Sequence, residues 1–186
     1  MNLLSFDIEI YNDLPEGNNR DLSDVIPSIG AFCTTADNVE FYYDDPYMSK
    51  ETAQQLVLDM LALYENDFVP FTWNGLSFDL NLLATYSGMI DECSYLALNH
   101  IDGMFLIVAH RGFMLGLDAA LKGANLETKT HSVELNDKTL FTEMSGAKAP
   151  ELWRNREFEA VKTYLKGDVT QPLKLAKVIE QIGGIK

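Results

Sequence analysis

The first apolar segment of the chain, Leu3–Ile10, carries two acidic residues near its end, Asp7 and Glu9. On a β-strand, residues two apart point to the same face, so the two carboxylates share one face while Phe6 and Ile8 share the other. Two like charges side by side inside a domain are unfavourable unless a divalent cation lies between them. The segment therefore predicts a buried strand whose second face carries either a metal site or a pair of solvated acids.

Hydrophobic patterns along the rest of the chain indicate strands first and helices later, which is typical of an α/β fold with a mixed sheet flanked by helices. The length of 186 residues fits a single domain spanning residues 1–186. The expected strands, besides the first, are 28–35, 39–43 and 68–73, and a surface loop is expected at 12–27. The expected helices are 49–64 with Ser49 as its cap, 77–86, most of 91–123, and about 151–182 with a break near Gly167. Residues 124–150 show no sustained period.

Composition excludes several classes of protein. Hydrophobic residues make up 47% of the chain, as in an ordinary globular domain. Its apolar runs fall short of the ~18 residues that span a bilayer, and its N-terminus does not read as a signal peptide, so no membrane partner is expected. Cys33 and Cys93 form neither a C-x-x-C pair nor a disulfide framework. These features favour a cytoplasmic protein.

Charge is distributed unevenly along the chain. The net charge is −14, which argues against a broad basic surface for nucleic acid. Residues 1–110 nevertheless hold 18 acidic and only two basic residues, whereas residues 111–186 hold 12 basic and 10 acidic ones. Phosphate contacts are therefore expected from the second half. The candidates are Arg111, Lys122, Lys129, Lys148, Arg154, Arg156 and Lys166.

A second motif, Phe71–Asp79, passes from a strand through a turn into a helix. Gly75 permits a sharp turn, and Asn74 can satisfy backbone groups of the loop. Asp79 falls in the first helical turn, where the helix dipole favours a carboxylate and where the side chain faces the ends of the strands. Alone, Asp79 is better explained as an ordinary acid at a helix start.

A third motif lies in the last helical segment, where Tyr164 and Asp168 are four residues apart and share a helix face. Gly167 next to Asp168 lowers helix stability by ~1 kcal/mol relative to Ala. Its presence indicates that backbone or a ligand comes close at this point. Each residue alone has a simpler explanation, a core tyrosine and a solvated acid.

Together the motifs D-x-E at Asp7, N-G-x-x-F-D ending at Asp79 and Y-x-x-x-D ending at Asp168 resemble the three exonuclease motifs of the DEDD superfamily of 3′–5′ exonucleases. With tyrosine at position 164, the chain resembles the DEDDy branch of the superfamily. Within that branch it resembles the stand-alone group related to the proofreading exonuclease of family-B DNA polymerases. In the histidine branch a histidine would stand at position 163, where this chain has Thr163. The resemblance runs from Asp7 to about residue 176.

This resemblance implies a ribonuclease H-like fold and a 3′–5′ exonuclease, and it leaves DNA and RNA open as substrates. The leading expectation is a metal-dependent enzyme that releases 5′-mononucleotides from single-stranded DNA ends. Asp7, Glu9, Asp79 and Asp168 are expected to hold two Mg²⁺ or Mn²⁺ ions, with Asp7 bridging them, because all-carboxylate sites suit hard cations. Two ions ~3.5–4 Å apart stabilise both the attacking and the leaving oxygen of an in-line phosphoryl displacement. Tyr164 is expected to orient the attacking water, since an ordinary tyrosine pKa near 10 makes a poor general base.

The substrate is expected to be a single strand threaded into this site, DNA in preference to RNA. Ile10 and Tyr11, just beyond the first motif, are expected to contact or stack on the terminal base, although Tyr11 has ordinary packing explanations too. Asn74 is expected to bind substrate from the turn. Trp73 and Phe78 are expected in the core.

Three other functions remain open on sequence grounds. They are an exoribonuclease on the same fold, an endonuclease of ribonuclease H type, and a catalytically inactive nucleic-acid-binding domain. Three scattered histidines, His100, His110 and His131, share no metal-binding spacing and are left outside the site. Asp102 is expected to cap a helix that begins at Gly103 rather than to bind metal. The sequence identifies no protein partner.

Overall fold

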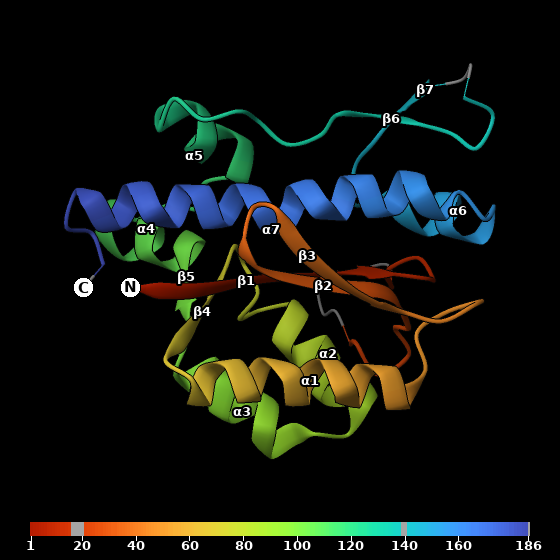
Figure 1. The fold of residues 1–186 in the computed structure, drawn as a ribbon, viewed down its shortest axis with the longest axis horizontal. Coiled ribbons are helices and arrows are strands. Elements are labelled where there is room, and N and C mark those ends of the chain that lie inside the picture. The colour runs from red at the N-terminus through yellow and green to blue at the C-terminus, as the bar shows by residue number, and fades with distance from the viewer. Residues whose placement is uncertain (16–20, 139–140, 186) are drawn as a thin grey trace.

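The computed structural model describes residues 1–15, 21–138 and 141–185. A five-stranded sheet lies between two layers of helices (Figure 1). The strands of this sheet are β1 (Asn2–Ile10), β2 (Pro27–Thr35), β3 (Asn38–Tyr43), β4 (Phe68–Thr72) and β5 (Ile101–Asp102). The helices are α1 (Lys50–Glu65), α2 (Asp79–Ser87), α3 (Ile90–Leu98), α4 (Gly103–Arg111), α5 (Leu117–Gly123), α6 (Ala149–Arg154) and α7 (Phe158–Gln181).

The acidic strand β1 lies in the centre of the sheet, whose order is β3-β2-β1-β4-β5. It pairs antiparallel with β2 and parallel with β4. The predicted mixed sheet flanked by helices is therefore confirmed. The short edge strand β5 was not predicted, because two residues are too few to show a hydrophobic period.

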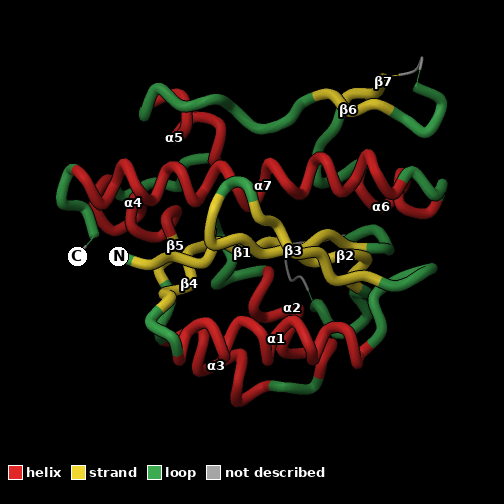
Figure 2. The backbone as a smooth tube through the Cα atoms, viewed as in Figure 1, coloured by secondary structure: helices red, strands yellow, loops and turns green. Residues whose placement is uncertain are grey.

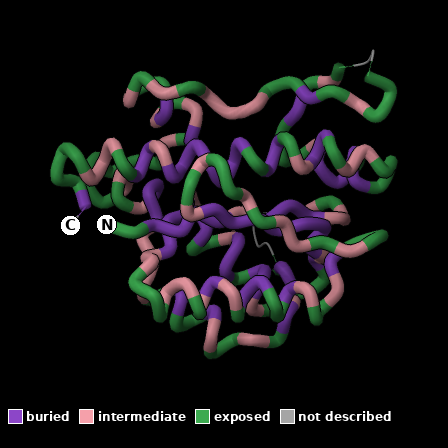
Figure 3. Tube along the Cα trace, in the orientation of Figure 1, coloured by how far each residue is buried: buried purple, intermediate pink, exposed green. Residues whose placement is uncertain are grey.

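The two faces of β1 meet different layers. Leu4, Phe6 and Ile8 are buried against α1, α2 and α3, whereas Leu3 is buried in the cluster formed with α6 and α7. Figure 3 shows buried residues along the sheet and along the sides of α1 and α7 that face it. Period-two alternation thus directs the odd-numbered positions of β1, including Asp7, towards α7.

Helix α1 begins where the sequence predicts. The Ser49 hydroxyl accepts a hydrogen bond from the backbone N–H of Thr52 at 3.1 Å, which satisfies one of the free donors at the helix start. The loop before β2 lacks helix and strand at residues 12–15 and 21–26; residues 16–20 of the predicted loop lie outside the described residues. Within this loop the Asn12 amide donates to the carbonyl of Asp24 at 2.9 Å and accepts from the N–H of Ile26 at 2.7 Å.

The long C-terminal helix is interrupted at a different place from the one predicted. The break falls at residues 155–157, between α6 and α7, and α7 runs through Gly167 without interruption. A Cβ at Gly167 would lie 2.8 Å from the hydroxyl of Thr130. Gly167 therefore does not end a helix but allows the segment around Thr130 to lie against it.

The segment without a sustained period contains a small hairpin, β6 (Ser132–Glu134) and β7 (Phe141–Glu143), which the sequence did not predict. Figure 2 shows this hairpin and α5 on the side of α7 that faces away from the sheet. Strands of three residues carry too few side chains to reveal an alternation. Each helix of the described residues is too short or too polar to cross a lipid bilayer.

Candidate active site

A cleft opens where the parallel strands β1 and β4 part. Their pairing ends at Ser5 and Phe71, so the next backbone donors of β1 on that side need another acceptor. The N–H of Ile8 donates to the Asp79 carboxylate at 3.2 Å. Asp79, the first residue of α2, therefore stands where a strand partner would otherwise be, and its side chain is brought to the centre of the sheet.

Three further carboxylates meet beside it. Oxygen atoms of Asp7, Glu9 and Asp168 all lie within 4.8 Å of one another. Two of these residues come from β1, and the third comes from α7, which covers that face of the sheet. Glu9 and Asp168 are 6% and 7% exposed, and Asp7 is half-buried. The four acids of the three motifs thus converge, although they are separated by up to 161 positions along the chain.

Tyr164 lies one turn before Asp168 on α7, is buried, and lines the same cleft. Lys129 contacts both residues: its ammonium group donates to the Asp168 carboxylate at 2.8 Å and to the Tyr164 hydroxyl at 2.9 Å. The ammonium nitrogen also lies 5.0 Å from the centre of the tyrosine ring. Lys129 was predicted only as one of seven phosphate contacts, so its position in the acidic centre was missed.

Two features beside the four acids and Tyr164 hold the segment of Lys129 in place. Its backbone N–H donates to the Asp118 carboxylate of α5 at 2.9 Å, and the same carboxylate lies 3.0 Å from the His131 imidazole. Gly167 leaves room on α7 for Thr130, the next residue. The glycine beside Asp168 did indicate a close approach, but the sequence did not show which segment approaches.

Burial and mutual repulsion raise the pKa values of the clustered acids. Desolvation is the largest cause for Asp7 and Glu9, and neighbouring carboxylates add to it, so both pKa values stand well above the usual range. Burial raises the pKa of Asp79 to about 7, although the N–H groups of Asp79 and Ile8 oppose this. The pKa of Asp168 is also raised by burial, against the effect of Lys129.

The basic and phenolic groups of the cleft are perturbed too. Burial would lower the pKa of Lys129, but Asp168 and Tyr164 outweigh it, and the net shift is upward, so the ammonium stays charged. Burial, and then Asp168, raise the pKa of Tyr164. A phenol with a raised pKa keeps its proton at neutral pH and serves as a hydrogen-bonding group rather than as a base.

The donor set of the cluster fits divalent cations of the hard type. All candidate ligands are carboxylate oxygens, which suit Mg²⁺ and Mn²⁺. One oxygen of Asp168, Oδ1, is buried and has no hydrogen-bond partner among the described residues. A buried carboxylate oxygen without a partner is unfavourable, so a cation bound by Asp7, Glu9 and Asp168 would satisfy an unmet requirement of the fold.

The cleft has a volume of about 520 Å³ and is lined by most of the predicted site residues, Ile10 and Asn74 among them. Trp73 and Phe78, expected in the core, are half-buried and also line the cleft. Tyr11 does not belong to this lining. Its ring packs on Tyr47 at 5.3 Å between centroids, and its role in substrate binding stays a prediction.

Comparison with solved structures identifies a relative of this fold. No protein-family model matches the sequence, and no curated protein matches it either. The structure is similar to the family B DNA polymerase from the hyperthermophilic archaeon Pyrobaculum calidifontis, with a TM-score of 0.69 and 18% sequence identity over 96% of this chain and 24% of the polymerase. The two share one fold. The chain thus spans about a quarter of the polymerase that it matches.

Two further matches are structures of exonuclease I. One is a product-bound form, with a TM-score of 0.45 and 13% identity over 96% of this chain and 43% of the other. The second is E. coli exonuclease I in complex with a 5cy-dT13 oligonucleotide, with a TM-score of 0.44 and 15% identity over 96% of this chain and 40% of the other. The likeness to the polymerase, at 18% identity, establishes the fold and not the activity. It confirms the ribonuclease H-like fold that the motifs predicted.

Proposed function

We propose that this chain is a metal-dependent 3′–5′ exonuclease acting on single-stranded DNA ends, built as one domain over residues 1–186. The observation that carries the proposal is the convergence of four carboxylates and Tyr164, from three distant motifs, on one cleft. An ordinary structural role would not require Asp7, Glu9 and Asp168 to lie together, because like charges in a buried cluster destabilise a fold. A bound cation removes that cost.

Two divalent ions, when bound, would supply stabilisation of charge on the attacking and leaving oxygens of the phosphodiester. Asp7, Glu9 and Asp168 are the proposed ligands of one ion, and Asp7 and Asp79 those of the second. Tyr164 orients the attacking water through its hydroxyl. Lys129, which already bonds both Tyr164 and Asp168, keeps that hydroxyl fixed and adds a positive charge where the phosphate enters.

The surroundings of the cleft support a single strand as substrate. A second groove of about 530 Å³ shares Trp73, Asn74 and Lys129 with the cleft and continues past Met104 and Met114. An apolar and aromatic lining beside one cation suits stacked bases and a phosphate backbone. The family resemblance does not distinguish DNA from RNA, and a substrate comparison decides between them.

The direct test measures release of nucleotides from a 3′-labelled oligonucleotide in Mn²⁺ or Mg²⁺. We expect 5′-mononucleotides from the unmutated protein and none after chelation. Asp7→Asn should lower the rate by at least about 100-fold, since one preorganised electrostatic group is worth roughly 10²–10³ in rate. Glu65→Gln removes an exposed carboxylate at the end of α1, in the opposite helix layer, and should leave the rate unchanged.

Matched substrates separate the alternatives. RNA of the same sequence identifies an exoribonuclease if it is degraded faster than the DNA. A circular single strand has no 3′ end, so its cleavage would indicate an endonuclease. Full activity of Asp7→Asn, or binding of oligonucleotide without any metal-dependent release, would overturn the proposal.

A further inference from the structure

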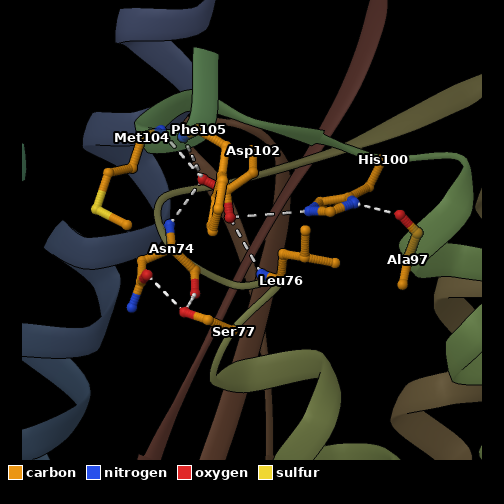
Figure 4. Close-up of polar contacts among 8 residues, drawn as sticks. All are labelled: Asn74, Leu76, Ser77, Ala97, His100, Asp102, Met104 and Phe105. Atoms are coloured by element: carbon orange, nitrogen blue, oxygen red, sulfur yellow. Dashed lines mark hydrogen bonds and ion pairs between the residues drawn. The ribbon is translucent and has the colours of Figure 1, made fainter. Parts of the chain in front are cut away.

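Another buried carboxylate, Asp102, lies outside the acidic cluster and accepts four backbone N–H groups (Figure 4). Two donors come from the start of α4, where Met104 and Phe105 donate to Oδ1 at 3.0 and 3.3 Å. The other two come from the turn after β4, where Asn74 donates to Oδ1 at 3.0 Å and Leu76 donates to Oδ2 at 3.1 Å. One side chain therefore joins the helix cap to the turn of the second motif.

Capping α4 requires only one of the two carboxylate oxygens. A serine hydroxyl caps a helix about as well as a carboxylate does. The second oxygen, Oδ2, accepts from the N–H of Leu76 in the turn, whereas both donors of α4 bond Oδ1. His100 lies next to it with Nε2 at 4.0 Å, too far for a hydrogen bond, while Nδ1 donates to the carbonyl of Ala97 at 2.7 Å. The side chains of His100 and Asp102 are both 3% exposed, and Oδ2 accepts from the N–H of Leu76 in the turn.

The turn that Asp102 holds has little conformational freedom of its own. Asn74 has a backbone φ of +73°, a left-handed conformation that is uncommon outside glycine. A Cβ at Gly75 would lie 2.6 Å from the Thr72 side chain, and one at Gly103 would lie 2.8 Å from Phe71 and Trp73. The turn is thus pressed between β4 and the start of α4, and the N–H groups of Asn74 and Leu76 both donate to the Asp102 carboxylate.

Asn74 connects this arrangement to the cleft. Its side-chain carbonyl accepts from the Ser77 hydroxyl at 2.6 Å, and its side chain lines the cleft. Figure 4 shows the amide oxygen of Asn74 bonded to Ser77, while the amide nitrogen makes no hydrogen bond to the residues drawn. We propose that Asp102 is a positioning residue for substrate binding: by fixing the N–H groups of Asn74 and Leu76, it holds the Asn74 amide where it donates to the terminal nucleotide. This inference rests on the proposed function.

The test uses Asp102→Ser, which keeps a cap for α4 but lacks the oxygen that reaches Leu76. With the labelled oligonucleotide and Mn²⁺, we expect KM to rise by about tenfold. The displaced Asn74 amide would lose its hydrogen bond to the charged terminal nucleotide, and the loss of such a bond weakens binding by about that factor. The value of kcat should stay within about threefold, because Asp79 is held separately by Ile8. Asp102→Asn, which keeps the shape and one acceptor, should give a smaller rise in KM and serves if the serine variant does not fold.

Two controls distinguish positioning from loss of stability. Ser49→Ala removes the cap of α1 in the other helix layer, and should lower the melting temperature without changing KM. In an Asn74→Gly background, which tolerates the positive φ, Asp102→Ser should change KM by less than about twofold because the amide through which it acts is gone. An unchanged KM for Asp102→Ser, or an equal rise in both backgrounds, would overturn the inference.

Hydrogen exchange provides a readout that does not depend on activity. The amide of Leu76, whose acceptor Oδ2 the serine lacks, should exchange at least about tenfold faster in Asp102→Ser than in Ser49→Ala, since local opening is governed by local contacts. If the unmutated protein released no nucleotides, the proposed function would fail, and the exchange rates alone would decide whether Asp102 holds the turn. Retained protection of the Leu76 amide would then refute it.

Discussion

Residues that alternate along β1 belong to its two faces, and these faces differ in chemistry: one is apolar throughout, and the other carries the acids of the candidate site. On one face Leu4, Phe6 and Ile8 are buried among the apolar residues of α1, α2 and α3. On the other face the strand changes along its length from Leu3, which is apolar, to Asp7 and Glu9, which are charged. The first face contributes hydrophobic stabilisation over the whole strand, whereas the second loses it where the cleft begins.

This difference indicates which part of the sheet loses stability so that the candidate site can form. The α7 side also keeps apolar packing, because Val161, Leu165 and Val169 belong to the same buried cluster as Leu3 and Ile29 of the sheet. Near the cleft, α7 supplies Asp168 instead, and the charge of Lys129 only partly offsets the acids. The apolar face can offset this loss of stability because its buried cluster continues through α1 and α2.

The largest effect is expected when one residue on each face is substituted in turn and the free energy of unfolding is measured without metal. Leu4→Ala should lower the free energy of unfolding by roughly 2–5 kcal/mol, the usual cost of a cavity left by a fully buried leucine. Asp7→Asn should raise it at pH 8, because it removes a buried charge that its neighbours repel. Chemical denaturation followed by circular dichroism gives both values, and a destabilised Asp7→Asn would show that the acids support the metal-free fold.

A smaller effect is expected for Tyr164, which belongs to the functional face but binds no cation in the proposed scheme. Tyr164→Phe should lower kcat by roughly 10- to 100-fold, the range expected when a reacting group is misplaced. Stabilisation of the protein by Mn²⁺ should be retained, because the carboxylates remain. Single-turnover release from the labelled oligonucleotide and melting temperatures with Mn²⁺ measure the two quantities. An unchanged kcat would remove Tyr164 from the chemistry, and a lost Mn²⁺ effect would make it part of the metal site.

The sequence predicted the parts of the molecule that depend on local pattern. The strand ending in Asp7 and Glu9, the cap at Ser49 and the cap at Asp102 all follow from spacing and residue type, and the structure confirms them. Convergence of the motifs was predicted by resemblance and not by periodicity. It depends on the parting of β1 from β4, which brings Asp79 to the N–H of Ile8, and no local signal encodes that.

Residues whose role comes from distant neighbours were missed for the same reason. Lys129 lies in a segment without periodicity, and its position depends on Asp118 and on the space at Gly167. The second function of Asp102 depends on the turn at Asn74, nearly thirty residues earlier. A pattern within a window of residues identifies a cap, but it does not report that the same carboxylate holds another segment.

The smallest effect is expected for the pH dependence of metal binding, which should differ between variants of the two faces. The folded-state pKa of Asp79 is about 7, against about 3.9 for an unperturbed aspartate. Between these values the folded protein binds more protons than the unfolded chain, so metal-free stability falls as pH rises from about 4 to about 7. Metal binding requires the deprotonated acids, so stabilisation by Mn²⁺ should grow across the same window.

At pH 8, saturating Mn²⁺ should raise the melting temperature by roughly 5–10 °C, and at pH 5 by far less. Differential scanning fluorimetry measures both shifts. Leu4→Ala should start from a lower melting temperature and keep the difference between the two pH values, whereas Asp7→Asn should lose it. Equal shifts at pH 5 and pH 8 would mean that the metal binds away from the buried acids.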